Sequence, residues 1–380
     1  MMMAPAPMAL VLLLGGCLCA ASSAPPVASP PPLREGATFA EFAARYRPQG
    51  YSNSTERSHR ATVFSANQLA VRRHNAAADS GNHSFWLALN EWADMTHHEW
   101  VAKMMLRPTT PPRQAAVGAP SSSPDRKGRQ VPAKVDWTSP DTCKQPSGCV
   151  TSVKNQGYCG ACWAFSAAGA MESAYAIANG KLVNASVQQI LDCQAGANAC
   201  AGGDTQDGVL YAIGNGGLAS WEDYPYTSGA AQQVTPCCAS PDPAHPYTCL
   251  PAKITIDAYD RVPAADEDAL MEYVALSPVS VNVNASRELM QFYSYGVYDV
   301  DCSPQTDHGV LAVGYGSGGT ETMAYDFSQS GRNKTDCGSW CEDCWGNPHC
   351  SGCKSMSHQA RPCLATLACA MSSRELTAQS

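Results

Sequence analysis

The distribution of apolar and polar positions divides the chain into a helical part followed by a strand-rich part. Residues 162–179 form an Ala-rich apolar run, and it ends at Gly180, a residue type that readily closes a helix. From about residue 253 onward, β-branched and alternating residues predict strands instead. The expected strands are 254–256, 279–283 and 309–316. We therefore expect an α+β fold with its helices first.

The segment 39–104 shows a further helical periodicity ahead of these elements. Six of its residues follow one another at spacings of four, four, three, four and four, which places their side chains on one helical face. They are Glu56, Arg60, Phe64, Asn67, Val71 and Asn75. Periodicity alone also fits an ordinary amphipathic helix, so the spacing by itself predicts structure rather than function.

Two further segments are predicted to be processing signals rather than parts of the fold. Residues 8–20 are apolar but too short to span a membrane comfortably, and small residues follow, with cleavage expected after Ala20 or Ala24. We therefore predict a signal peptide over 1–24 and no membrane association. Residues 107–130 are rich in Pro and Ser and lack periodicity, which predicts an exposed linker where processing cuts concentrate.

Composition indicates the compartment and argues against one class of partner. Nineteen cysteines in 380 residues are too many for a reducing cytosol. They favour the secretory pathway, ending in a lysosome- or endosome-like compartment or outside the cell. A net charge of −8 without a basic tract argues against nucleic acid as a partner. The chain also carries triplets that permit N-glycosylation, at Asn53, Asn82, Asn184, Asn284 and Asn333.

The candidate chemistry starts at the N-terminus of the apolar helix. Residues 159–163 read Cys-Gly-Ala-Cys-Trp, so Cys162 opens the helical run. A cysteine in a first helical turn lies at the positive end of the helix dipole, which favours the thiolate over the thiol. With a histidine beside it, such a cysteine can attack amide carbonyls.

This pentapeptide resembles the C-G-[SA]-C-[WY] signature of papain and the cathepsins. The earlier helix strengthens the resemblance, because its six residues match the E-R-F-N-I-N pattern of cathepsin L-like propeptides with Val71 in place of Ile. Downstream, Ala88-x-Asn90-x-Trp92-x-Asp94 approximates the G-x-N-x-F-x-D pattern of the same family. The chain is thus similar to papain-like cysteine proteases that carry an inhibitory propeptide.

The resemblance implies the domain organisation and the general function. It implies a prodomain over residues 25–106, then the linker, and a catalytic domain over residues 131–316. The expected fold is papain-like, with a helical lobe and a β-barrel-like lobe. The expected activity is hydrolysis of peptide and protein substrates by a monomeric zymogen that its own propeptide inhibits. No cofactor and no metal are expected.

The resemblance also assigns the site residues. Gln156 corresponds to the side chain that stabilises the oxyanion, and His308 to the base that pairs with Cys162. His308 lies 146 residues after Cys162, within the spacing of this family. The predicted substrate-binding residues are Gly202, Gly203, Asp204, Thr205, Asn282, Asp307 and Gly309. Because this pocket is more polar than usual for the family, we expect it to accept polar or basic side chains.

Several disulfides are expected. The resemblance implies a bond between Cys159 and Cys200, and a bond from Cys193 to Cys237 or Cys238, of which we take Cys238. It pairs Cys302 with a cysteine near the C-terminus. Residues between Trp137 and Val150 exceed the family pattern, and their two cysteines, Cys143 and Cys149, predict a small extra disulfide loop.

The resemblance ends after Gly316. The family orients its histidine with the Asn of an Asn-Ser-Trp-Gly motif, and no such motif follows here. Asn333 lies 25 residues past His308 and is the candidate for that role, although its flanking residues differ. Residues 317–380 form an atypical Cys-rich tail in which we expect no terminal strands.

Three explanations for the tail remain open. It is a genuine end with weakened catalysis, a misread or frameshifted end, or a Cys-rich appendage held by disulfides, and we favour the misread end. Two functions remain open in consequence. The chain is an active endopeptidase zymogen, or an impaired or inactive homologue that acts as a binding or inhibitory protein.

Overall fold

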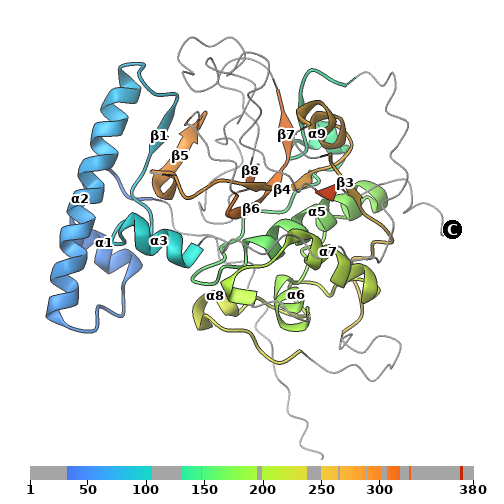
Figure 1. Ribbon diagram of the computed structural model, residues 1–380, viewed down its shortest axis with the longest axis horizontal. Coiled ribbons are helices and arrows are strands. Elements are labelled where there is room, and N and C mark those ends of the chain that lie inside the picture. The colour runs from blue at the N-terminus through green and yellow to red at the C-terminus, as the bar shows by residue number, and fades with distance from the viewer. Residues whose placement is uncertain are drawn as a thin grey trace, which may run out of the picture.

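The structure is a computed structural model of the 380-residue chain. It describes residues 32–104, 131–146, 148–194, 199–237, 250–263, 266–287, 289–298, 300, 306–316, 325–326 and 369–370. Figure 1 shows the elements of the predicted prodomain along one side, a group of helices around the central helix α5, and strands above them. The predicted signal peptide, the linker, Asn333, Cys302 and nearly all of the tail lie outside the described residues.

Helix α5 (Cys162–Asn179) is the centre of the catalytic part. Its residues are nearly all buried, since it packs against α6 and α7 on one side and against the strands β4 and β6 on the other. The expected helix is confirmed at both ends, and Gly180 closes it in the left-handed region with φ of 67°. Small residues let the layers approach closely: a Cβ on Gly169 would lie 3.1 Å from the side chain of Leu311.

Shorter helices surround α5 on the side away from the sheet. Polar side chains cap several of them, as Ser186 does for α6 by accepting from the Gln189 N–H. The remaining helices of the catalytic part are α4 (Pro140–Cys143), α6 (Val187–Cys193), η1 (Ala199–Ala201), α7 (Thr205–Gly214), α8 (Ser228–Ala231), α9 (Glu267–Val274) and η2 (Met290–Phe292).

A five-stranded antiparallel sheet in the order β3-β9-β4-β6-β8 covers the other side of α5. Its central strands β4 (Val279–Val283) and β6 (His308–Ala312) are buried throughout, and Val283 pairs with His308. Because His308 is the first residue of β6, this register places it at one end of the sheet. The edge strands are β3 (Asp260–Arg261) and β8 (Tyr325–Asp326), and β9 (Cys369–Ala370) lies between β3 and β4. A separate pair is formed by β2 (Val135–Asp136) and β7 (Gly314–Tyr315).

Two strand predictions are wrong. Residues 254–256 form no strand, and Ile254 makes a single bridge to Leu218, after which the chain leaves the partner backbone. Conversely, the tail contributes two short strands where none was expected, because β8 pairs with β6 and β9 pairs with β3 and β4. A strand of two residues pairs through its backbone groups and depends little on its side chains, so neither case has a reliable sequence pattern.

The predicted prodomain contains three helices, α1 (Phe39–Tyr46), α2 (Ser54–Asp79) and α3 (His97–Met104). It is not helical throughout, since β1 (Phe85–Leu87) lies between α2 and α3. This strand pairs antiparallel with β5 (Tyr293–Gly296) of the catalytic part. The prodomain thus attaches by a shared two-stranded sheet that periodicity did not predict.

The disulfide predictions have mixed outcomes. The bonds Cys159–Cys200 and Cys143–Cys149 are present as expected. Cys193 is bonded to Cys237, so the choice of Cys238 was wrong. The two cysteines are adjacent in sequence, and only the position of the backbone beside α6 decides between them. Cys238 itself lies outside the described residues.

The described part of the chain contains no helix that is long and apolar enough to cross a membrane.

Candidate active site

The predicted nucleophile Cys162 is the first residue of α5 and is fully buried. It is the free cysteine of the described residues, because its neighbour Cys159 is bonded to Cys200. Burial raises the pKa of the Cys162 thiol to about 12, although the backbone N–H groups of Gly309 and Trp163 act in the opposite direction. In this closed form the sulfur is therefore held as a thiol.

The start of β6, where His308 lies, is brought against the N-terminus of α5 by the packing of the two elements. A Cβ on Gly309, the next residue along β6, would lie 3.3 Å from the carbonyl oxygen of Cys162. His308 is 2 % exposed, and burial lowers its pKa to about 4. Its Nδ1 atom is buried without a hydrogen-bond partner among the described residues. The lowered pKa favours the neutral imidazole, and no described residue forms a hydrogen bond with its Nδ1.

Gln156 joins the same site from the loop before α5. Its Nε2 donates to the carbonyl of Cys159 at 2.9 Å and also lies 3.5 Å from the carbonyl oxygen of Met104, the last residue of α3. Tyr226 donates its hydroxyl to the main-chain oxygen of Gln156 at 2.7 Å, which fixes the loop from the other side. The predicted oxyanion donor is therefore buried against the end of the prodomain.

We expect Gln156→Ala to lower kcat about 10²- to 10³-fold while KM changes little, because an oxyanion donor acts mainly in the transition state. Steady-state kinetics of the matured enzyme on a peptide substrate measure this. Gln194→Ala, a substitution of the same kind at the C-cap of α6, is the control. An equal loss in both variants would show that Gln156 contributes only to folding.

The two predicted backbone-binding glycines lie beside the helix that carries Cys162. Gly202 has φ of 111°, a conformation that only glycine takes readily. A Cβ on Gly203 would lie 2.5 Å from the ring of Trp163, so the ring itself requires glycine there. Trp163 is held in turn by its Nε1, which donates to the carbonyl of Ala199 at 3.2 Å. The glycines thus have a packing role besides the predicted contact with substrate.

Thr205, Asn282 and Gly309 come together although they are far apart in sequence. Asn282 pairs with Gly309 across β4 and β6, and a Cβ on Gly309 would lie 3.3 Å from the methyl group of Thr205. The Thr205 hydroxyl and the Asn282 Oδ1 are buried without hydrogen-bond partners among the described residues. Unpaired buried polar atoms are costly unless a ligand satisfies them.

The two carboxylates among the predicted substrate-binding residues already accept hydrogen bonds from the backbone. Asp204 caps α7, with its Oδ1 2.9 Å from the Gln206 N–H. Asp307 accepts from the backbone N–H groups of Ala285 at 2.7 Å and Ser286 at 3.2 Å, which ties the end of β4 to the start of β6. Both residues support the site by positioning its elements.

The contact between prodomain and catalytic part involves a residue that no sequence signal indicated. Gln291, in η2, donates from Nε2 to the carbonyls of Trp92 and Met95, and its own carbonyl accepts from Asn90 at 2.7 Å. Beside it, Asn155 donates to Glu91 at 3.0 Å. Residues 90–95, which carry part of the propeptide pattern, are therefore bound directly to the catalytic part.

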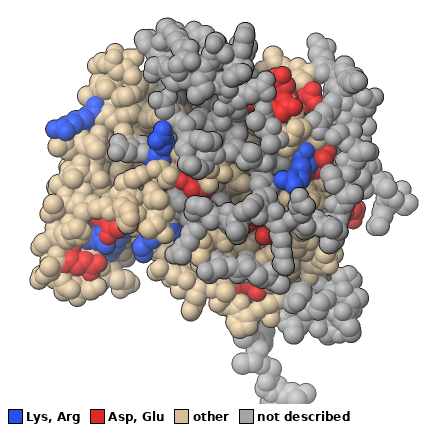
Figure 2. Space-filling model, in the orientation of Figure 1, with Lys and Arg blue, Asp and Glu red and all other residues tan. Residues whose placement is uncertain are grey.

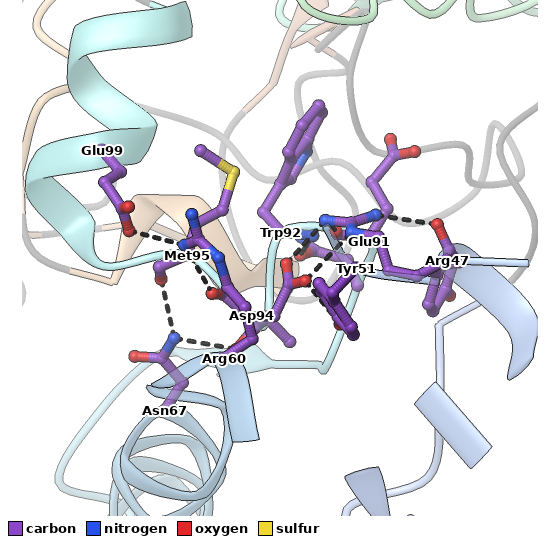
Figure 3. A network of polar contacts seen from close by, with 12 residues as sticks. Arg47, Tyr51, Arg60, Asn67, Glu91, Trp92, Asp94, Met95 and Glu99 are labelled. Atoms are coloured by element: carbon purple, nitrogen blue, oxygen red, sulfur yellow. Dashed lines mark hydrogen bonds and ion pairs between the residues drawn. The ribbon is translucent and has the colours of Figure 1, made fainter. Parts of the chain in front are cut away.

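Charged and polar side chains of the prodomain, some of them from the two propeptide patterns, fix the conformation of residues 90–95. Arg47 makes an ion pair with buried Asp94 at 2.6 Å, and Tyr51 donates to the same carboxylate. From α2, Arg60 makes an ion pair with Glu99 at 3.0 Å, while Asn67 donates to the backbone on either side of Asp94. Figure 3 shows these side chains meeting around the segment 91–95. The spacing on one helical face thus has a structural reason.

Comparison with known proteins defines the class to which this fold and site belong. The model described as papain family cysteine protease matches residues 131–348, and the cathepsin propeptide inhibitor domain matches residues 39–100. Because the first match covers more than half of the chain, the chain belongs to the papain family of cysteine proteases and carries a propeptide inhibitor domain. The fold expectation is confirmed.

Particular relatives agree with this membership. The chain is 34 % identical over 329 residues to a senescence-specific cysteine protease of Oryza sativa, covering 85 % of this chain and 88 % of the relative. It is 36 % identical to cathepsin S of Mus musculus, covering 70 % and 74 %. Among solved structures it resembles procathepsin L 3 of Tenebrio molitor larval midgut with a TM-score of 0.64 and 27 % identity, covering 88 % and 97 %.

Proposed function

We propose that the protein is an endopeptidase zymogen in which Cys162 attacks the peptide carbonyl. The observation that supports the proposal is that the buried, unbonded Cys162 has Gly309, the neighbour of His308 on β6, against its carbonyl oxygen, while Gln156 donates to Cys159 three residues before it. Peptide hydrolysis by a thiol needs a nucleophile, a proton donor for the leaving amine and donors for the oxyanion. These three residues supply one of each.

The chemistry begins when the prodomain leaves. Removal of α3 frees the Gln156 amide from Met104 and admits solvent to Cys162 and His308, so the proton moves from sulfur to imidazole. The thiolate attacks the carbonyl carbon, and the oxyanion accepts hydrogen bonds from Gln156 Nε2 and the Cys162 backbone N–H. The protonated His308 then gives its proton to the departing amine, and water hydrolyses the thioester.

The proposal is tested with a substrate-like epoxide that alkylates active-site thiolates. After acid activation we expect one adduct, mapped by mass spectrometry to Cys162, and its loss in His308→Ala. Absence of labelling at every pH, in protein that has lost its prodomain, would favour the second candidate, an impaired or inactive homologue that acts by binding. The unpartnered Nδ1 of His308 is the observation that keeps this candidate open; Asn333 is the proposed orienting residue.

We further propose that the zymogen enters the secretory pathway and acts in a lysosome-like compartment or outside the cell. Three disulfides within the described residues support an oxidising environment. On the face shown in Figure 2, acidic and basic side chains of the described residues are interspersed rather than gathered by sign. No face of one charge is thus seen there among these residues for nucleic acid to bind. The proposed partners are peptide and protein substrates, besides the propeptide itself.

The pocket predicts the substrate preference. Thr205 and Asn282 offer unpaired polar atoms beside Gly309, which adds no side chain of its own. We expect polar or basic residues at the position two before the cleaved bond to be cleaved at least as well as Leu or Phe, because they satisfy these atoms. A dipeptide–fluorophore library measures the ratio. A clear preference for Leu or Phe in the unaltered enzyme would contradict it, whereas Asn282→Val should shift the ratio toward Leu and Phe.

Acid activation is predicted from Glu99, which links α3 to α2. Burial raises the pKa of Glu99, but hydrogen bonds from Arg60 and Thr96 outweigh it and leave the pKa below its usual value. Its stabilising effect is therefore present above the carboxyl's unfolded pKa and is lost as the pH falls through the lowered value. Glu99→Gln lacks this effect at every pH, so its processing should reach half-maximal rate at a higher pH.

The size of this effect is limited because Glu99 is one-third exposed. Such a pair contributes about 1 kcal/mol at most, which corresponds to roughly fivefold faster processing above the normal midpoint. Gel densitometry of the precursor against pH measures the shift, with Glu222→Gln on the exposed surface of the catalytic part as control. An unchanged midpoint in Glu99→Gln would remove Glu99 from the mechanism.

A further inference from the structure

The structure separates the glycosylation triplets into two kinds by the exposure of their asparagines. Asn53 and Asn82 are exposed, and both lie in the prodomain. Asn284 is 5 % exposed at the end of β4, and Asn184 has its Oδ1 buried in the turn before α6. A sugar chain needs space around the amide nitrogen, so the four described triplets are not equivalent. Asn333 lies outside the described residues.

From this difference we propose that N-linked oligosaccharides are attached at Asn53 and Asn82 of the prodomain and at neither Asn184 nor Asn284 of the catalytic part. The inference rests on the proposed entry into the secretory pathway. The donor is a lipid-linked oligosaccharide diphosphate of the host. The bond from the first sugar carbon to the phosphate oxygen breaks, a bond to the asparagine Nδ2 forms, that nitrogen loses a proton, and the lipid diphosphate leaves.

At Asn53 the local structure leaves the reacting atom free. Asn53 is the N-cap of α2, and its Oδ1 accepts from the Glu56 N–H at 2.9 Å. The cap uses the oxygen, whereas glycosylation takes place on Nδ2. The sugar and the cap are therefore compatible. The hydroxyl residue of the triplet, Thr55, is exposed as well.

At Asn82 the chain turns outward between α2 and β1. Gly81 has φ of 78°, the Asn82 N–H donates to Ala77, and the Asn82 side chain is exposed. Ser84, the hydroxyl residue of the triplet, donates to the carbonyl of Val297 in the catalytic part. A sugar on Asn82 thus lies beside the β1–β5 contact between prodomain and catalytic part, and does not enter it. Figure 1 shows the ends of α2, beside which both asparagines lie, on the outer side of the molecule.

The catalytic part has no comparable space at its described triplets. The Asn184 carbonyl accepts from Trp221, and the next residue, Ala185, donates to buried Glu172 at 2.7 Å. Asn284 lies between Val283, which pairs with His308, and Ala285, which donates to Asp307. An oligosaccharide at Asn284 would displace buried structure immediately beside the active site. At Asn184 the side chain is only half-buried, but its Oδ1 lies in the interior and the chain on either side is held by the Trp221 and Glu172 contacts, which leaves less room than at Asn53 or Asn82.

It follows that the sugars leave with the prodomain. Among the four described triplets, two carry oligosaccharides in the zymogen, and maturation removes both together with the prodomain. Sugar at positions 53 and 82 thus marks the inhibited form.

The test is expression of the full chain in a secretory eukaryotic host, followed by peptide-N-glycosidase treatment in heavy-oxygen water and peptide mapping. We expect labelled aspartate at positions 53 and 82 and none at 184 or 284. Thr55→Ala removes the first triplet without touching the cap, and Asn82→Gln removes the second, so each should lose one oligosaccharide. Asn184→Gln and Asn284→Gln should leave the sugar content of secreted protein unchanged.

The outcomes distinguish this inference from the proposals on which it depends. Label at 184 or 284 in secreted protein, or secretion with 53 and 82 unlabelled, would overturn it. A second variant, in which an established secretory leader replaces residues 1–24, tests entry into the secretory pathway separately. If sugars appear at 53 and 82 in this variant only, the chain's own residues 1–24 do not direct secretion, and the assignment of the two sites is supported. Peptidase activity is read separately, so inactive protein with the expected sugars would refute only the catalytic proposal.

Discussion

Cys162→Ser is expected to lower kcat/KM for peptide hydrolysis about 10⁴- to 10⁶-fold and to leave the precursor unprocessed in acid. A hydroxyl is a far weaker nucleophile than a thiol that an imidazole can ionise. Because Ser and Cys are nearly isosteric, buried Cys162 should be replaced without loss of folding. Fluorogenic assays after maturation by an added protease measure the activity, and thermal unfolding measures the fold.

A double substitution sharpens this test. His308→Ala should cost a similar factor, and Cys162→Ser with His308→Ala should be no worse than the worse single variant, because residues that act as a unit are strongly non-additive. Multiplying losses would show that the two residues act separately. Residual activity of more than a few per cent in folded Cys162→Ser would refute its role as nucleophile.

Glu172→Gln should give the largest loss of stability. Glu172 is 1 % exposed on α5 and accepts from Lys154 Nζ at 2.9 Å, from Thr151 Oγ1 at 2.6 Å and from the Ala185 N–H at 2.7 Å. The substitution leaves the Lys154 ammonium buried without its counter-charge. Breaking a buried pair in this way costs about 3–5 kcal/mol.

The midpoint of denaturant unfolding measures this loss, provided that its slope stays constant. Glu222→Gln, the same change on the surface, should leave the midpoint unchanged. Lys154→Met combined with Glu172→Leu should recover much of the stability, because it removes both charges together. An equal midpoint for Glu172→Gln and the control would show that the pair contributes nothing. Because Lys154 lies two residues before Gln156, a folded single variant should also show a lower kcat.

Local patterns predicted those features that depend on neighbouring residues. The extent of α5 follows from its apolar run and Gly180, and Arg60 and Asn67 belong to one helical face that does contact the segment 91–95. The strand β1 was not predicted, because its pairing partner lies more than two hundred residues away. Gln291 was missed for the same reason, since its role comes from hydrogen bonds to two carbonyls and one side-chain amide of the prodomain.

The sequence by itself determined the family, the three candidate catalytic residues and the presence of an inhibitory propeptide, because each depends on short patterns of residue types. Tertiary structure alone decided that β6 lies on α5, so that Gly309 beside His308 meets Cys162. It also decided that Cys237 rather than Cys238 is bonded to Cys193, and that Asp204 and Asp307 accept from backbone N–H groups. It also decided the burial of both groups, which no local pattern specifies and which raises the pKa of the Cys162 thiol and lowers the pKa of His308.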